Sequence, residues 1–202
     1  MNVAEEAVRN PAPVGGRVPG RLQTIVVLAV TGLVIAVVAI LMSGALGGGT
    51  SDVQLSGNAT GAVAGGLPPG FTATTYDGKK VSLADYAGKP LWLQFGGSWC
   101  PDCRVEAPDV EAAYEKYKAQ GLNVLAVFIA EPASDIAAYA GRAGLTFPIA
   151  VDERSAIAGT YHAVGYPTHV FIGADGRIRS VLNGALKPSD MDREIAAILP
   201  AQ

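Results

Sequence analysis

The chain has 202 residues, of which half are apolar and 16% are charged, and its formal net charge is −3. This length suits one domain of ordinary size with extensions. The apolar share allows a sizeable core and a membrane segment. The lack of a basic excess argues against a nucleic-acid-binding protein. Two cysteines can form one disulfide, but they cannot support a disulfide-rich scaffold.

The N-terminal part differs in composition from the rest of the chain. Residues 1–21 are rich in Pro and Gly and show little apolar periodicity, so we expect a disordered tail. Residues 22–42 contain no charge, and as a helix they would span about 31 Å, the thickness of a bilayer's hydrocarbon core. We predict a transmembrane helix here, because the apolar core of a cleaved signal peptide is usually shorter. Cleavage after this segment stays open as an alternative.

The charges around this segment predict its orientation. Three arginines precede it, namely Arg9, Arg17 and Arg21. No Lys or Arg follows it until Lys79. By the positive-inside rule, the N-terminus lies in the cytoplasm and the rest of the chain lies outside the cell membrane. Residues 43–66 are rich in Gly, Ala and Ser, which predicts a flexible linker with a reach of about 30 Å.

Residues 67–202 are expected to form a single domain in which strands alternate with helices. The predicted strands are 71–75, 80–83, 91–95, 122–130, 146–152, 168–173 and 177–182. The predicted helices are a single turn at 83–87, then 101–120 with an interruption at Pro108, 134–142, 153–161 and 188–199. Asp-Gly pairs at 77–78 and 175–176 mark turns. This order predicts an α/β fold with a central sheet and helices on both faces.

The two cysteines, Cys100 and Cys103, lie in the stretch FGGSWCPDCRVEAP, between a buried-strand candidate and a helix. Unpaired N–H groups and the helix dipole favour an anion at a helix N-terminus. We therefore predict that Cys100 has a lowered pKa and is the nucleophile. Cys103, one turn later, could attack the Cys100 sulfur and close a disulfide. The pair predicts a two-electron redox switch.

Two cysteines at this spacing could also belong to a zinc site or form a structural staple. A structural zinc site needs four ligands, and the only further candidates are His162 and His169, far along the chain. A purely structural disulfide would close a very short loop, which constrains the unfolded chain least. We favour a redox centre over both.

The stretch from about residue 67 to 202 resembles the thioredoxin superfamily, in particular its membrane-anchored TlpA/ResA-like branch. The resemblance rests on LWLQFGGSWCPDC, followed in the family's order by VFIAEP, TFPIAVDE and VGYPTHVFIGADGRI. It implies a thioredoxin-like fold with a central mixed sheet flanked by helices. It also implies thiol–disulfide exchange with protein substrates outside the cytoplasm, often with apocytochrome c, and a membrane thiol protein as electron donor. It implies no cofactor and no metal.

The resemblance also suggests roles for single residues. Pro167 matches the family's cis-proline, which lies against the cysteine pair and shapes the groove for partner chains. Glu131 resembles an active-site glutamate of ResA-like proteins and could shuttle the proton of Cys103. Alternatively, Glu131 is a solvated acid at a helix start, where negative charge is favoured. The residues expected to border the substrate groove are Trp99, Pro101, Asp102, Tyr166 and Thr168.

Two residues bear on proton transfer and redox potential. Typical thioredoxins carry a buried aspartate where this chain has Gln94, which cannot titrate. We therefore expect proton transfer to use Glu131, water or both. Asp102 lies between the cysteines and disfavours a thiolate, which would favour the disulfide form. If Asp102 points to water, its charge is screened and matters little.

Two competing functions belong to other classes. A thioredoxin-like copper carrier could use Cys100, Cys103 and His169, since soft thiolates suit Cu(I). Such carriers usually space their cysteines by three residues, and this chain has two between them. A peroxidase of the peroxiredoxin type needs a threonine before its reactive cysteine and a nearby arginine, a pattern that Ser98 and Arg104 fit poorly. We expect a membrane-tethered thiol–disulfide oxidoreductase that acts as a reductant.

Overall fold

A computed structural model of the chain describes residues 20–42, 53–56 and 61–200. Most of the tail predicted at 1–21 and much of the linker predicted at 43–66 lie outside the described residues. The N-terminal helix and the domain after it are separate compact units, and each is described by itself.

The N-terminal unit contains helix α1, Arg21–Met42, which confirms that the segment 22–42 is helical. Within the part of the chain that the structure describes, no helix has both the length and the hydropathy needed to cross a membrane. The prediction that residues 22–42 form a helix is therefore confirmed.

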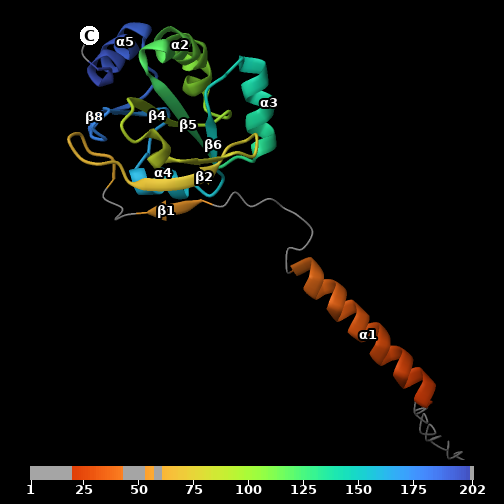
Figure 1. Cartoon of the computed structure of the whole chain (residues 1–202). Helices are drawn as coiled ribbons and strands as arrows, with labels where there is room; N and C mark the ends of the chain where they lie inside the picture. Colours follow the sequence, from red (N-terminus) through yellow and green to blue (C-terminus); the bar gives the residue numbers. More distant parts are fainter. Residues whose placement is uncertain (1–19, 43–52, 57–60, 201–202) are drawn as a thin grey trace, which may run out of the picture. The chain divides into compact units, whose positions relative to one another are not determined.

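The domain is built on a mixed five-stranded sheet in the order β6-β5-β4-β7-β8 (Figure 1). The strands are β4 Leu91–Gly96, β5 Asn123–Ile129, β6 Ile149–Asp152, β7 Thr168–Ile172 and β8 Ile178–Asn183. β4, β5 and β6 run parallel, while β7 is antiparallel to both β4 and β8. The central strand β4 is buried along its whole length, as its apolar run predicts.

A small antiparallel sheet adds to the domain. It consists of β1 Gln54–Ser56, β2 Gly70–Thr74 and β3 Lys80–Ser82. β1 falls inside the segment predicted as linker, and its backbone pairs with β2. Backbone hydrogen bonds also join Ala62 N to Tyr161 O and Ile178 N to Gly66 O. The folded domain therefore begins before residue 67, because these backbone groups find partners in it.

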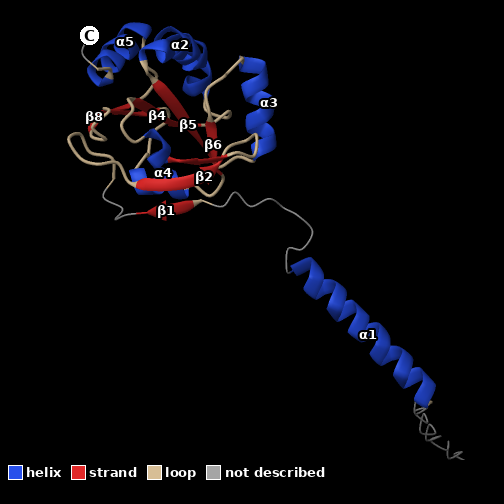
Figure 2. Ribbon diagram, in the orientation of Figure 1, coloured by secondary structure: helices blue, strands red, loops and turns tan. Residues whose placement is uncertain are grey.

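Helices cover both faces of the five-stranded sheet (Figure 2). Helices α2 Pro101–Tyr117, α3 Ala133–Ala143 and α5 Pro188–Ile198 share one apolar cluster with Trp92 and Phe171. Helix α4 Ala156–Tyr161 and the small sheet share the other cluster with Leu91 and Leu93. Neighbouring residues of β4 thus face opposite sides, as strand geometry requires. The predicted thioredoxin-like α/β architecture is confirmed.

The ends of several elements differ from the predictions. The turn predicted at 83–87 is a 3₁₀ helix, η1 Leu83–Tyr86, whereas α2 continues through Pro108 and is followed by the 3₁₀ turn η2 Lys118–Gln120. Helix α4 begins at Ala156 and not at 153. The reason is local: the Asp152 carboxylate accepts hydrogen bonds from Ala156 N at 2.8 Å and Ala158 N at 2.9 Å. These bonds satisfy N–H groups of the first turn, which have no partner inside the helix.

Candidate functional site

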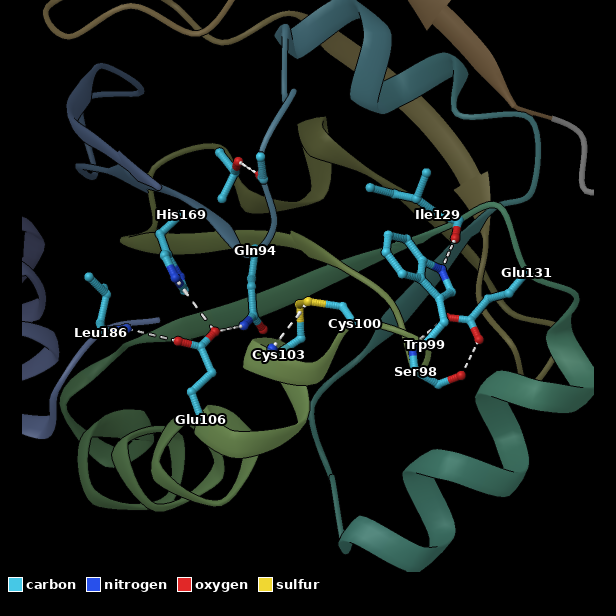
Figure 3. The surroundings of a disulfide bond; sticks show 12 residues. Gln94, Ser98, Trp99, Cys100, Cys103, Glu106, Ile129, Glu131, His169 and Leu186 are labelled. Atoms are coloured by element: carbon cyan, nitrogen blue, oxygen red, sulfur yellow. Dashed lines mark hydrogen bonds and ion pairs between the residues drawn. A yellow bond between two sulfur atoms is a disulfide. The ribbon is translucent and has the colours of Figure 1, made fainter. Parts of the chain in front are cut away.

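The cysteine pair lies where the central strand β4 gives way to helix α2 (Figure 3). Cys100 is the N-cap of α2, and its Sγ accepts a hydrogen bond from Cys103 N at 3.2 Å. The two residues form a disulfide with a Cα–Cα distance of 5.3 Å, and both are buried. The predicted position at a helix N-terminus is confirmed. The roles of nucleophile and resolving cysteine stay predictions.

The two glycines before the motif have packing reasons. A Cβ on Gly96 would lie 2.8 Å from Sγ of Cys103, closer than real side chains approach. A Cβ on Gly97 would collide with the indole ring of Trp99. Because glycine has no Cβ, it leaves room for the Cys103 sulfur and for the Trp99 indole at these two positions.

Trp99 and Tyr166 form one border of the site. The Trp99 indole is 48% exposed, and its Nε1 donates to Ile129 O at 2.8 Å. Its ring meets Tyr166 edge-on at 5.6 Å. The Tyr166–Pro167 peptide bond is cis, as the resemblance implied. These residues bring the segment before Cys100 together with the segment before β7.

The other residues predicted to border the groove divide into two groups. Pro101 and Asp102 are exposed in the first turn of α2. Thr168 is buried, and its hydroxyl donates to Asn183 Oδ1 at 2.8 Å. The side chain of Thr168 is thus turned into the fold and offers nothing to a partner chain.

Glu131 is buried beside the loop that precedes Cys100. Its carboxylate accepts a hydrogen bond from Ser98 N at 2.6 Å and a second one from the Ser98 hydroxyl. Glu131 thereby holds the loop two residues before the nucleophile candidate. Its described hydrogen bonds go to Ser98 and not to Cys103, so they give no support to the proton shuttle predicted for it.

A second buried carboxylate, Glu106, is one that the sequence patterns alone did not single out. It lies one turn after Cys103 in α2, where it is 2% exposed. Its Oε1 accepts from Gln94 Nε2 at 2.5 Å, and its Oε2 accepts from Leu186 N at 3.0 Å. Burial raises the pKa of Glu106 to about 7, although both hydrogen bonds oppose the shift.

Glu106 is a further candidate for proton transfer beside Glu131 and water, whose use stays a prediction. Gln94 does not titrate itself, but its amide holds a carboxyl that does. A signal for this was present in the sequence. The buried positions of α2 recur at helical spacing, and Glu106 lies among them: Cys103, Glu106, Ala107, Val110 and Ala113. A carboxylate on a buried helix face indicates a functional group.

His169 is fully buried on the same side of the sheet as Glu106 (Figure 3). Its Nδ1 accepts a hydrogen bond from Trp92 Nε1 at 3.2 Å, and its Nε2 lies 3.5 Å from Glu106 Oε1. Burial lowers the pKa of His169 to about 4. The backbone of Gly184 opposes this shift, and the ring of Phe171 stacks near the imidazole. Among the described residues, no three His, Cys, Asp or Glu side chains are grouped as metal ligands, so the copper-carrier set is not assembled.

Several hollows mark the surface of the described domain. An apolar one, about 280 Å³, is lined by Phe71, Leu83 and Tyr86, and neither cysteine lines it. Another, about 390 Å³, is lined by Ser98, Arg104 and Tyr139, among others. Ser98 and Arg104 flank the cysteine pair in sequence, so this hollow adjoins the site. The arrangement can exchange disulfides, with a buried carboxyl available for proton transfer.

Comparisons with known proteins agree with this site. The model of the AhpC/TSA family matches residues 65–181. The thiol–disulfide oxidoreductase ResA of Geobacillus kaustophilus is 34% identical over 141 residues, covering 70% of this chain and 81% of the relative. The solved structure of a putative thiol:disulfide interchange protein DsbE from Chlorobium tepidum has a TM-score of 0.63 and 29% identity, covering 69% of this chain and 99% of that one.

A secreted disulfide oxidoreductase of Mycobacterium tuberculosis is also similar in structure, with a TM-score of 0.59 and 26% identity. That likeness covers 62% of this chain and 94% of the other. Together with the fold and the cysteine pair, these matches establish that the chain belongs to the AhpC/TSA family of thioredoxin-like proteins.

Proposed function

We propose that this thiol–disulfide oxidoreductase reduces disulfides in protein substrates through Cys100 and Cys103. The observation that carries the proposal is the disulfide at the N-terminus of α2, closed between the N-cap residue and the residue one turn on. In the reduced enzyme, the Cys100 thiolate attacks a substrate disulfide and forms a mixed disulfide. Cys103 then attacks Cys100 and releases the reduced substrate.

The reducing direction is supported by the charges around the pair. An oxidant such as DsbA keeps a strongly stabilised thiolate, which favours its reduced form. Here Asp102 lies in the first turn of α2, and Glu106 lies one turn beyond Cys103. Negative charge at both places opposes a thiolate and so favours the disulfide form. An enzyme that prefers its own disulfide form passes electrons to its substrates.

The apolar residues exposed near the motif favour a polypeptide as substrate. Trp99 is 48% exposed, Val105 is 75% exposed, and Val164, just before the cis-proline segment, is 91% exposed. We take these three side chains as candidate contacts for an unfolded polypeptide near the cysteine pair. The resemblance to TlpA/ResA-like proteins makes apocytochrome c the substrate to test first, with a membrane thiol protein as electron donor. Its haem-attachment motif is C-x-x-C-H.

A trapping experiment tests the exchange reaction. The reduced full-length Cys103→Ser chain is mixed with an oxidised peptide that contains a C-x-x-C-H disulfide. We expect a stable mixed disulfide through Cys100, visible by mass spectrometry. Cys100→Ser is the matched control and should trap at least about tenfold less. Equal trapping by both variants, or by neither, would contradict the assignment of Cys100 as the nucleophile.

We further propose that the domain works outside the cytoplasmic membrane, tethered by residues 22–42. The support comes from the sequence, namely the uncharged segment and the three arginines before it. The chain has only two cysteines, so thiol labelling reports on the domain alone. A membrane-impermeant maleimide should label the reduced pair in intact cells. Labelling that requires lysis would contradict this location.

A further inference from the structure

A buried polar cluster links three elements beside the cysteine pair. It consists of Trp92 and Gln94 on β4, His169 on β7 and Glu106 on α2. All four are 5% exposed or less.

Cys103 adjoins the cluster, because Glu106 follows it by one helical turn. Its Sγ also packs against Gly96, which lies on the same face of β4 as Gln94. Figure 3 shows Gln94, Glu106 and His169 on the opposite side of the disulfide from Glu131.

Trp92 determines which nitrogen of His169 carries the proton. An indole N–H can only donate a hydrogen bond. Trp92 Nε1 lies 3.2 Å from His169 Nδ1, so Nδ1 must be the unprotonated acceptor. The imidazole is fully buried and neutral near pH 7, since burial lowers the pKa of His169 to about 4. The single imidazole proton therefore resides on Nε2.

The Nε2–H group of His169 faces Glu106. Nε2 lies 3.5 Å from Glu106 Oε1 and, among the described residues, makes no hydrogen bond. A buried N–H without a partner is costly, and 3.5 Å is at the long limit for a hydrogen bond. An ionised Glu106 would draw this donor closer, because hydrogen bonds to charged groups are shorter and stronger.

Every polar neighbour that the structure gives Glu106 in the cluster is a donor. Gln94 donates to Oε1 and Leu186 N donates to Oε2, while His169 Nε2 lies 3.5 Å from Oε1. A protonated carboxyl would have to place its own hydrogen among these three donors. The donors therefore favour the carboxylate, while burial favours the acid. His169 is the donor whose orientation depends on another side chain, Trp92.

We propose that His169, locked by Trp92 in its Nε2–H tautomer, is a positioning residue that holds Glu106 as the carboxylate able to accept the proton of Cys103. This inference rests on the proposed thiol–disulfide exchange and names a further residue for it. No hydrogen bond of the structure joins His169 to either cysteine sulfur, so His169 acts through Glu106.

Proton and electrons balance in this step. In the mixed disulfide, the Cys103 thiol gives its proton to the Glu106 carboxylate. The Cys103 thiolate attacks Sγ of Cys100, the Cys100–Cys103 bond forms, and the bond between Cys100 and the substrate breaks. The electron pair leaves with the substrate thiolate, which takes a proton from solvent or from Glu106. The enzyme's two thiols are oxidised to the disulfide, and the substrate disulfide is reduced.

Other titratable groups near Glu106 do not act as donors in place of His169. Asp102 and Asp109 of α2 raise the pKa of Glu106 further, and the charge of Glu106 contributes to the raised pKa of Tyr139 of α3, which burial causes first. Lys187, next to Leu186, is exposed. None of these groups supplies a buried donor to the carboxylate, so the neutral imidazole has this role.

Nuclear magnetic resonance tests the tautomer directly. The full-length chain, labelled with ¹⁵N-histidine and held in detergent, is measured by long-range ¹H–¹⁵N correlation at pH 7. We expect the Nε2–H pattern for His169, with His162 assigned by the variant His162→Gln. An Nδ1–H or doubly protonated pattern for His169 would overturn the inference.

Variants test the effect on Glu106. The pH midpoint of the Glu106 carboxyl is read from its ¹³C shift, assigned with Glu106→Gln. His169→Phe keeps a ring but removes the donor, and should raise the midpoint by about half to one unit. His169→Gln restores a donor and should recover most of the shift. Phe171→Leu, which alters the ring that stacks on Trp92 and lies near His169, is the packing control and should leave the midpoint unchanged.

The rate of substrate release from the mixed disulfide separates the two proposals. In His169→Phe, the pH dependence of this rate should move upward with the carboxyl midpoint. An active His169→Phe enzyme with an unchanged midpoint and pH profile would overturn the inference and leave the proposed function intact. A Cys103→Ser chain that forms no mixed disulfide would contradict the proposed function itself.

Discussion

The Gln94 amide donates a hydrogen bond to Oε1 of Glu106, and this contact joins the central strand to the active-site helix beside Cys103. Typical thioredoxins have their buried acid on the strand. Here the strand supplies the amide, and the acid is on the helix. The same two elements still meet through one buried, titratable carboxyl. The chain thus has a buried carboxyl one turn after Cys103, although Gln94 on the strand does not titrate.

The variant Glu106→Gln tests whether this carboxyl transfers the proton of Cys103. General acid–base catalysis contributes roughly 10²- to 10⁴-fold, so we expect at least about a 10²-fold slower release of substrate at pH 7. Stopped-flow Trp fluorescence after mixing reduced enzyme with an oxidised peptide gives the rate. Glu153→Gln changes an exposed acid and is the control. A rate within about threefold of wild type would show that another group takes the proton.

The stability of the fold should depend on pH through Glu106 and His169 in opposite ways. The pKa of Glu106 is raised from 4.5 to about 7, so its contribution is present below pH 4.5 and is lost as pH rises through 7. The pKa of His169 is lowered from 6.5 to about 4, so its contribution is present above pH 6.5 and is lost as pH falls through 4.

These signs predict different curves for the two variants. In wild type the two slopes oppose each other between pH 4.5 and 6.5. Relative to wild type, Glu106→Gln should gain stability as pH rises from 4.5 to 7, by up to about 3 kcal/mol. His169→Phe should lose stability relative to wild type as pH rises from 4 to 6.5. Urea unfolding at a series of pH values measures both effects. Stability curves of the two variants that run parallel to that of wild type would contradict the opposite pKa shifts of Glu106 and His169.

The sequence predicted most of the fold because its signals are local. The apolar run of β4, the long run of β5 and the Asp-Gly turn between β7 and β8 each indicate one element. Strand β1 was missed because Gln54–Ser56 is short and lies in a segment rich in Gly and Ala. Its pairing with β2 is a tertiary effect that no local pattern encodes.

The site was predictable in part. The position of Cys100 at a helix N-terminus and the cis bond before Pro167 are confirmed. The cis bond was predicted from the family resemblance and not from a local pattern. The Trp92–His169–Glu106 contacts could not be predicted, since they join residues from three elements whose packing the sequence does not state. Glu106 was not predicted, although its helical spacing from Cys103 and Val110 is visible in the sequence and places it on the face of α2 that is buried.

Gly96→Ala tests the close packing of strand and sulfur. A Cβ there would lie 2.8 Å from Cys103 Sγ, so either the strand or the helix must shift. We expect a loss of about 1–3 kcal/mol in stability and a changed reduction potential. The control is Gly141→Ala in α3, where nothing lies within 4 Å and alanine should stabilise the helix by up to about 1 kcal/mol. Equal effects in both variants would contradict the packing argument.

Glu131→Ala tests how the loop before Cys100 is held. This change leaves both donors of Ser98 without their acceptor and should cost about 1–3 kcal/mol in the free energy of unfolding. Ser98→Ala keeps the backbone N–H bond and should cost less. Glu131→Gln keeps an acceptor and should lie close to wild type. A larger loss in Ser98→Ala than in Glu131→Ala would reverse the assignment of Glu131 as the group that anchors the loop.

The reduction potential of the Cys100–Cys103 pair tests the central claim most directly. The full-length chain is equilibrated in glutathione or dithiothreitol buffers, and Trp fluorescence follows the pair, with Cys103→Ser as the control. We predict a reversible two-electron transition with a midpoint below about −250 mV, near that of thioredoxin. A midpoint near about −120 mV would mean an oxidant, and the absence of a reversible transition would contradict a redox function altogether.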